Sequence, residues 1–177
     1  MLARALLGKV MVTNIEGVLT SGLISETEAY AGVTDRASHA YGRRHTIRTA
    51  PMYKSGGTAY IYLIYGIYSL FNVVTAPEGT PHAVLIRGLE PLEGTDTMMQ
   101  RRSATNLKGL CNGPGKLARA MGIHYSDSGL SLLGNRIWIE DRGFQVSDEN
   151  IVTGPRIGVG YAGKDALLPY RFQLIET

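Results

Sequence analysis

Stretches in which apolar and polar residues alternate dominate the first part of the chain, and they predict β-strands. Residues 9–13 and 18–30 have this pattern on either side of Asn14-Ile15-Glu16-Gly17, a combination typical of a turn. Strand character returns further along the chain, and we expect later strands at residues 83–89, 137–140, 156–161 and 170–175. Strands are therefore the main predicted elements.

Two apolar runs rich in tyrosine, residues 58–65 and 67–74, are separated by a single glycine. A glycine between two β-rich runs is a hairpin signal. Alternation along the first run places Tyr60 and Tyr62 on one face of the predicted hairpin and leaves Tyr65 at its tip.

Helical signals are short and lie between the strands. Residues 2–7 are expected to form the end of a helix, and Glu90-Pro91-Leu92-Glu93 is expected to open a second helix that runs to about Arg102. The sequence Asn112-Gly113-Pro114-Gly115 is typical of a cap, here for a third helix over residues 116–121.

A long stretch over residues 31–57 carries glycine, proline and basic residues and is expected to be a loop region. A loop of that length is usually functional, or else its assignment as a loop is wrong. The combined pattern predicts an α+β fold. We expect a single compact domain with a curved, mostly antiparallel sheet, flanking helices and a protruding, tyrosine-bearing β-hairpin.

Composition supports one domain over residues 1–177, because 177 residues with 44% apolar side chains suffice for one substantial core. The only cysteine, Cys111, excludes an internal disulfide and a multi-cysteine zinc site, so a reducing compartment is expected. No apolar run is long enough for a secretory leader, and the longest, residues 60–74, is interrupted by glycine, serine and asparagine. We therefore expect no membrane span.

The charge is unevenly distributed, although the net charge is only +3. No carboxylate occurs between Asp35 and Glu78, or between Asp96 and Asp127, while both windows are rich in arginine and lysine. These windows have two interpretations: solvated basic surface, or a surface that follows the phosphates of a nucleic acid.

Candidate chemistry begins with Glu26, Glu28 and Tyr30, which period-two alternation places on one face of a strand. The segment alone is compatible with a solvated strand face and with a glutamate that acts as a general base. Arg87 lies in an apolar strand, where a half-buried arginine needs a carboxylate, and Glu28 or Glu90 would serve.

The predicted hairpin carries two further polar groups of interest. Its tyrosines, which include Tyr68, either pack in the core with hydroxyls at the margin or stack on nucleobases. Asn72 lies among apolar residues and is either a satisfied core amide or a group that reads the edge of a ligand. His39 has no second ligand at metal spacing, so no metal site is expected. Known phosphate-loop and serine-hydrolase motifs are absent from the sequence.

Taken together, six segments resemble the alkyladenine (3-methyladenine and hypoxanthine) DNA glycosylases of base excision repair. They occur in the family's order over nearly the whole chain: LARALLGKV, ETEAY with the later His39, GGTAYIYLIYGIY with Asn72, VLIRGLEPLEG, GPGKL, and RIGVGYAG through the terminal RF. The sequence departs from the family's pattern in two modest ways. The N-terminal segment that family members usually carry is expected to be shortened or absent. Tyr41 stands where some relatives have a basic residue, which leaves the phosphate contacts near this position open.

The resemblance implies roles for residues around a flipped base. Glu28 matches the glutamate that activates the hydrolytic water, and Arg87 matches the arginine that supports it. Tyr30 and His39 match residues on one side of the base, and Tyr62 matches the tyrosine on the other side.

The same resemblance implies further contacts to the base edge and to DNA. Backbone groups of Ala37 and His39 would meet the base edge, and Asn72 matches the amide that crowds the 2-amino group of guanine. Tyr65 matches the residue that intercalates where the base has left the stack. Arg44 and Lys116 match phosphate-side positions.

The implied activity is hydrolysis of the N-glycosidic bond of alkylated or deaminated purines (3-methyladenine, 7-methylguanine and hypoxanthine) flipped out of duplex DNA, with a glutamate-activated water and an abasic product. Because the proposed pocket segments contain no lysine, we expect a water nucleophile and no lyase activity. No cofactor is expected, and the protein is expected to be a monomer in the cytoplasm at the nucleoid if bacterial, or in the nucleus if eukaryotic.

Two other classes of function are compatible with parts of the sequence. A module that only binds nucleic acid would explain the basic windows, but such a module has no use for the carboxylate of Glu28 beside polyanionic DNA. A transferase or another small-molecule enzyme would leave the basic windows unrelated to nucleic acid. A steep salt dependence of DNA binding would separate these classes.

Overall fold

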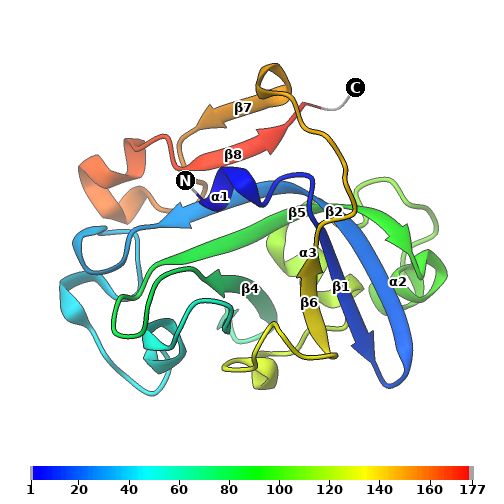
Figure 1. Ribbon diagram of the computed structural model, residues 1–177, viewed down its shortest axis with the longest axis horizontal. Coiled ribbons are helices and arrows are strands. Elements are labelled where there is room, and N and C mark those ends of the chain that lie inside the picture. The colour runs from blue at the N-terminus through cyan, green and yellow to red at the C-terminus, as the bar shows by residue number, and fades with distance from the viewer. Residues whose placement is uncertain (1, 176–177) are drawn as a thin grey trace.

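The computed structural model describes residues 2–175. In that part of the chain the strands form one eight-stranded sheet of order β3-β4-β5-β2-β1-β6, in which β8 pairs with both β2 and β7 (Figure 1). The strands are β1 Val10–Ile15, β2 Val18–Tyr30, β3 Ala59–Ile64, β4 Tyr68–Val74, β5 Ala83–Glu93, β6 Ile137–Glu140, β7 Ile151–Gly154 and β8 Arg171–Leu174.

The longest strand, β2, is the axis of the sheet. β5 pairs along one edge of β2, while β1 and β8 divide the other edge between them, with β8 taking Glu26 to Glu28. All of these pairings are antiparallel, as are the pairings of the remaining strands. The α+β fold with a curved, mostly antiparallel sheet is therefore confirmed.

Three short helices accompany the sheet: α1 Leu2–Ala5, α2 Thr95–Arg102 and α3 Pro114–Ala120. α3 begins with Pro114, whose fixed φ suits a first helical turn, and it packs against β4, β5 and α2. Its buried Leu117 joins Met11, Phe71 and Ile86 in the main hydrophobic core. None of the described helices is both long and apolar enough to cross a membrane.

The predicted hairpin is formed by β3 and β4, which pair from Ala59↔Val73 to Ile64↔Tyr68. At the turn, Tyr65 and Gly66 both have positive φ, at 53° and 71°. Residues 65–67 connect the paired Ile64 and Tyr68, and the backbone amide of Ile67 donates to the carbonyl oxygen of Ile64 at 3.2 Å. Tyr65 and Gly66 are thus the two central residues of a tight turn, and positive φ at both of these positions is typical of a type I′ turn. A tyrosine takes this conformation at a cost, and its side chain is 85% exposed at the tip. The turn therefore presents an aromatic ring to solvent.

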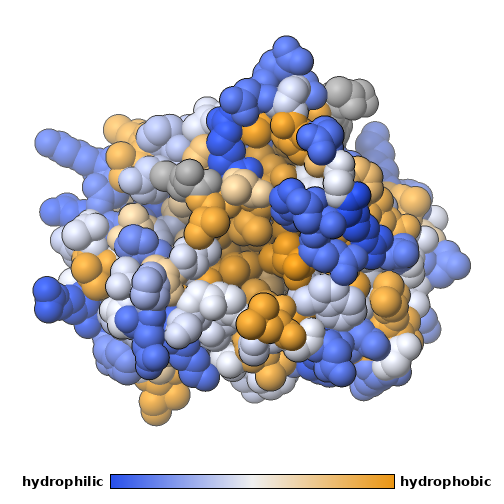
Figure 2. Space-filling view, in the orientation of Figure 1, coloured by the Kyte–Doolittle hydropathy of each residue, from blue (hydrophilic) through white to orange (hydrophobic). Residues whose placement is uncertain are grey.

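Residues 31–57 form a loop region with three 3₁₀ turns, at Gly32–Thr34, Tyr41–Arg43 and Ala50–Tyr53. The arginines of this region are exposed, in agreement with a basic loop. Figure 2 shows a hollow bordered by hydrophobic residues near the centre of one face of the molecule, with hydrophilic residues around it.

Two predicted elements are wrong. Residues 90–93 continue β5 instead of opening a helix, because the long β2 offers them a partner: Gly22 pairs with Pro91 and Ser21 with Glu93. The helix begins only after Gly94, whose φ is 71°. A side chain there would meet the carbonyl oxygen of Leu19, so only glycine fits.

The second error concerns residues 156–161, predicted as a strand. They form an irregular segment that leads into a 3₁₀ stretch at Gly160–Leu167. The backbone amide of Ile157 is bound to the carboxylate of Glu28 rather than to a neighbouring strand. A different, unpredicted strand, β7, pairs with β8 instead.

Candidate active site

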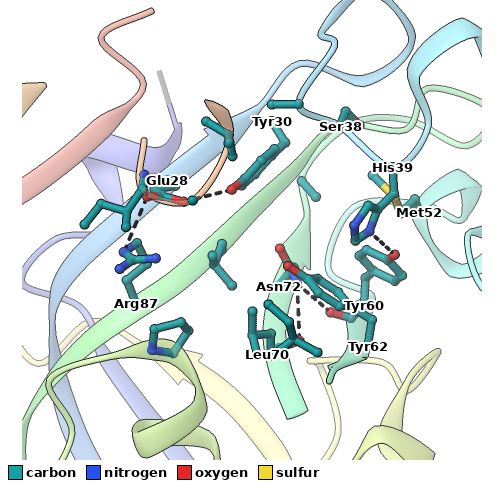
Figure 3. Close-up of a pocket in the computed structure, with 18 of the residues that line it drawn as sticks. Glu28, Tyr30, Ser38, His39, Met52, Tyr60, Tyr62, Leu70, Asn72 and Arg87 are labelled. Atoms are coloured by element: carbon teal, nitrogen blue, oxygen red, sulfur yellow. Dashed lines mark hydrogen bonds and ion pairs between the residues drawn. The ribbon is translucent and has the colours of Figure 1, made fainter. Parts of the chain in front are cut away.

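A cavity of about 410 Å³ opens between β2 and β5 on one side and the hairpin and the 31–57 region on the other (Figure 3). Cavities of this size hold small-molecule groups in proteins. Seven of the ten residues that the sequence singled out line it: Glu28, Tyr30, Ala37, His39, Tyr62, Asn72 and Arg87.

Glu28 lines this cavity although its side chain is 0% exposed. Its Oε1 accepts a hydrogen bond from the backbone amide of Ile157 at 2.8 Å, and its Oε2 accepts one from the hydroxyl of Tyr30 at 2.8 Å. Arg87 Nε lies 3.4 Å from Oε1. The interpretation of Glu28 as part of a solvated strand face is therefore wrong.

Arg87 is shared between two carboxylates. Its Nε donates to Glu26 Oε1 at 3.1 Å, closer than it lies to Glu28. Arg171 of β8 also pairs with Glu26, at 3.3 Å. Glu90, the other partner considered from the sequence, is exposed and forms no ion pair with Arg87 in the described part of the chain.

Burial sets the ionisation of Glu28. Loss of water raises the pKa of its carboxyl above the ordinary 4.5, and this effect outweighs the lowering by Arg87, the Ile157 amide and the Tyr30 hydroxyl. Arg87 thus stabilises the Glu28 anion, as expected, but the pKa of Glu28 remains above its ordinary value. A raised pKa brings the carboxylate closer to the pH at which a general base works best.

His39, Tyr60 and Tyr62 lie together on the opposite wall of the cavity. His39 Nδ1 lies 2.8 Å from the hydroxyl of Tyr60, and its ring meets the ring of Tyr62 edge-on at 4.5 Å between centroids. Burial, with help from Arg48 and Arg44, lowers the pKa of His39 to about 4. His39 is therefore neutral at pH 7 and contributes a flat, uncharged surface.

Asn72 is a buried amide with hydrogen-bond partners, and it also lines the cavity. The residue is 3% exposed, and its Nδ2 donates to the carbonyl oxygens of Tyr60 at 3.1 Å and Leu70 at 3.3 Å. Two hydrogen bonds use both hydrogens of the amide nitrogen. The side chain is thus fixed in orientation while it lines the cavity (Figure 3).

Sequence reasoning missed a buried ion pair behind the cavity. Arg156 Nη2 donates to Asp35 Oδ1 at 2.9 Å, and both side chains are almost completely buried. Arg156 Nη1 also donates to the carbonyl oxygen of Ala29, and the guanidinium lies 4.8 Å from the centroid of the Tyr30 ring. Asp35 in turn accepts from the backbone amide of Ala37.

This pair connects the loop after β2 with the segment after β7, and it places Ile157 beside Glu28. Its partners are 121 residues apart in the chain. The only sequence signals were that Asp35 begins an acid-free window and that an arginine precedes Ile157, and neither indicates burial.

The other three singled-out residues lie outside the cavity. Tyr65 follows the cavity-lining Ile64 at the hairpin tip, and Lys116 follows the cavity-lining Gly115. Lys116 Nζ donates to Asn112 Oδ1 at 2.8 Å on the surface, and Arg44 is exposed in the basic loop. Among residues 2–175, no group of three or more histidine, cysteine, aspartate or glutamate side chains could hold a metal ion.

A carboxylate within a cavity walled by aromatic rings suits a hydrolase that takes a flat ring and activates water. The model of the family described as methylpurine-DNA glycosylase matches residues 1–177, and the chain belongs to this family. The family consists of DNA-repair hydrolases that act in base excision repair.

Relatives from several bacteria carry the name "Putative 3-methyladenine DNA glycosylase". The protein of Bacillus cytotoxicus is 47% identical over 96% of this chain and 88% of its own length. The protein of Chlamydia abortus is 49% identical over 98% and 90%. That of Desulfitobacterium hafniense is 43% identical over 99% and 89%.

Replacing Arg156 with methionine is expected to lower the free energy of unfolding by about 3–5 kcal/mol, because Asp35 would remain as a buried, unpaired carboxylate. Denaturant titration followed by circular dichroism measures this loss. Arg142→Met is the matched control, since Arg142 pairs with Glu93 and Glu140 at the surface and should contribute less than about 1 kcal/mol. Equal losses in the two variants would contradict a stabilising role for the buried pair.

Glu28→Gln is expected to stabilise the protein at neutral and higher pH. Because the folded state raises the pKa of Glu28, its stabilising contribution is complete below the ordinary 4.5 and is lost as the pH rises through the folded-state pKa. The uncharged variant should therefore have the higher Tm at about pH 8, with a smaller difference at about pH 4. Thermal unfolding across this pH range tests the expectation, and a pH-independent difference would contradict it.

Proposed function

We propose that this protein flips alkylated or deaminated purines, among them 3-methyladenine, 7-methylguanine and hypoxanthine, out of duplex DNA and hydrolyses their N-glycosidic bond. The observation that carries the proposal is the position of Glu28: a fully buried carboxylate that still lines a cavity of about 410 Å³. A protein that only binds DNA gains nothing from such an anion, which costs free energy to bury.

The cavity would hold a base that has left the DNA stack. An enzyme that acts on a base within a duplex must extrude it, at a cost of a few kcal/mol that damage or mispairing reduces. The resemblance placed His39 on the Tyr30 side, but His39 lies against Tyr62, with 4.5 Å between their ring centroids. Tyr30 would therefore bound one side of the base and His39 with Tyr62 the other, with backbone groups of Ala37 and His39 at its edge. Tyr65, 85% exposed at the hairpin tip, would fill the gap left in the stack.

Basic side chains would supply attraction to the DNA backbone. Arg44 and Lys116 are exposed. Arg44 lies in the chain between the cavity-lining His39 and Arg48, and Lys116 follows the cavity-lining Gly115. Contacts of this kind make binding steeply dependent on salt. Duplex DNA with a damaged purine is the proposed partner of a monomeric enzyme, which would act at the nucleoid in a bacterial cell or in the nucleus of a eukaryotic one.

The proposed chemistry uses one carboxylate. Glu28 accepts a proton from water as the water oxygen bonds to the anomeric carbon, and the bond from that carbon to the base nitrogen breaks. The anion of Glu28 also stabilises the positive charge that develops on the sugar, and Arg87 supports its orientation.

The leaving group explains why a second carboxylate is not required. N-alkylation makes a purine cationic, so the base departs as a neutral molecule without a strong general acid. Hypoxanthine is neutral and must gain a proton. No lysine occurs among the residues that line the cavity, which supports a water nucleophile, an abasic product and no lyase step.

Glu28→Gln is expected to slow base release by at least about a hundredfold, the usual contribution of a general base, while the dissociation constant for lesion DNA stays within about threefold. Single-turnover assays with duplexes that carry one hypoxanthine or one methylated adenine, followed by detection of abasic sites, measure the rate. Glu90→Gln is the control, because Glu90 is exposed. An equal loss of binding would indicate a structural glutamate, and a covalent adduct trapped by borohydride would contradict the water nucleophile.

Asn72→Ser is expected to raise the release of undamaged guanine by about tenfold or more relative to hypoxanthine, because a shorter side chain leaves room for the 2-amino group. The ratio of the two single-turnover rates is the measurement. An unchanged ratio in a folded variant would remove Asn72 from the selection against guanine.

A further inference from the structure

Glu28 is surrounded unevenly. The backbone amide of Ile157 donates to Oε1 at 2.8 Å, and the charged Arg87 faces the same oxygen at 3.4 Å. Oε2 has one protein donor within residues 2–175, the hydroxyl of Tyr30 at 2.8 Å. An ionised carboxylate has about four acceptor positions, two on each oxygen. One position on Oε2 thus remains without a protein donor among residues 2–175, on a residue that lines the cavity.

Tyr30 is built to keep donating this hydrogen bond. Burial and the nearby Glu28 raise the pKa of the Tyr30 hydroxyl well above its ordinary range, so the group stays protonated. Glu28 and Tyr30 are two residues apart on the same face of β2, and both positions pair with β5. The guanidinium of Arg156 lies 4.8 Å from the ring centroid of Tyr30. Arg156 does not line the cavity, which leaves the other face of the ring to the cavity.

We propose that the hydroxyl of Tyr30 is a positioning group for Glu28: it fixes the rotation of the carboxylate and directs the free acceptor position of Oε2 toward the attacking water. This inference rests on the proposed function. It assigns Tyr30 two separable parts: a ring that lines the cavity, and a hydroxyl that orients Glu28, the general base of the proposed reaction. Tyr30 acts through Glu28 and is not itself a proton acceptor.

Several charged and titratable groups face Glu28 besides Tyr30. They come from β2, β3, β5 and the segment after β7, and they are Glu26, Tyr62, Arg87, Arg156 and Tyr161. A Tyr30→Phe substitution leaves all of them in place and removes only the one oxygen. Any change in the ionisation of Glu28 in this variant therefore reports the lost hydrogen bond.

Tyr30→Phe is expected to slow single-turnover base release at pH 7 by about ten- to a hundredfold, the effect of one hydrogen bond to a charged group. The dissociation constant for lesion DNA should stay within about twofold, because the ring remains. The acid limb of the pH–rate profile should move to higher pH, since the anion loses a stabilising donor. A merely structural contribution of the ring would leave that limb in place.

Tyr161→Phe is the matched hydroxyl deletion. Tyr161 also lines the cavity, but its hydroxyl donates to the carbonyl oxygen of Ala37 at 3.1 Å rather than to Glu28. This variant should not move the acid limb. An acid limb that moves equally in both variants, or in neither, would overturn the proposal.

A second readout separates this proposal from the proposed function. Titration of the Glu28 side-chain carbon by ¹³C NMR needs no substrate, and it should show a higher pKa in Tyr30→Phe than in the native protein, with Tyr161→Phe unchanged. If the native protein releases no damaged base, the proposed function fails. The titration still shows whether the Tyr30 hydroxyl donates to Glu28. Identical titration curves would overturn the proposal. Should Tyr30→Phe not fold, a 3,5-difluorotyrosine at position 30 strengthens the donor and must shift the pKa downward.

Discussion

The burial of one carboxylate constrains much of this structure. Glu28 lies in the longest strand of the sheet with no exposed surface, and an ion in that position requires charge and hydrogen bonds in return. Its partners come from three places: Tyr30 from the same strand, Arg87 from β5, and the Ile157 amide from the segment after β7. The sheet and the late segment must therefore meet at one point, and that point is the wall of the cavity.

A second buried ion pair holds this meeting point together. Arg156 bonds to Asp35 and to the carbonyl oxygen of Ala29, between Glu28 and Tyr30 in the chain. Because Arg156 precedes Ile157, anchoring the guanidinium fixes the amide that reaches Glu28. The backbone amide of Ile157 donates to the Glu28 carboxylate instead of to a neighbouring strand, and for that reason this segment does not continue as a strand. Stability and the geometry of the site thus depend on the same contacts.

The two walls of the cavity differ in charge. The Glu28 wall carries an anion whose pKa is raised by burial, with cations beside it. The aromatic rings of the facing wall are neutral: the pKa of His39 is lowered to about 4, and burial raises the pKa of Tyr62 above its ordinary value. Its charged group is a cation, Arg48, whose guanidinium lies 5.2 Å from the centroid of the Tyr62 ring. A flat ring held against neutral aromatic surfaces, with an anion at one end, is a consistent environment for a purine whose bond to the sugar is to be broken.

Local signals were enough to predict the strands with clear alternation, the hairpin around Gly66 and a helix after the cap at residues 112–115. Asn72 was recognisable as a polar group among apolar residues, and alternation placed Glu28 and Tyr30 on one strand face without deciding whether that face is buried. Only the tertiary structure decided that residues 90–93 extend β5, that Arg87 is shared with Glu26, and that Arg156 and Ile157 reach across to Asp35 and Glu28. The last contacts join residues more than a hundred positions apart. Periodicity and capping act over a few residues, so they hold no information on which distant donor will satisfy a buried charge.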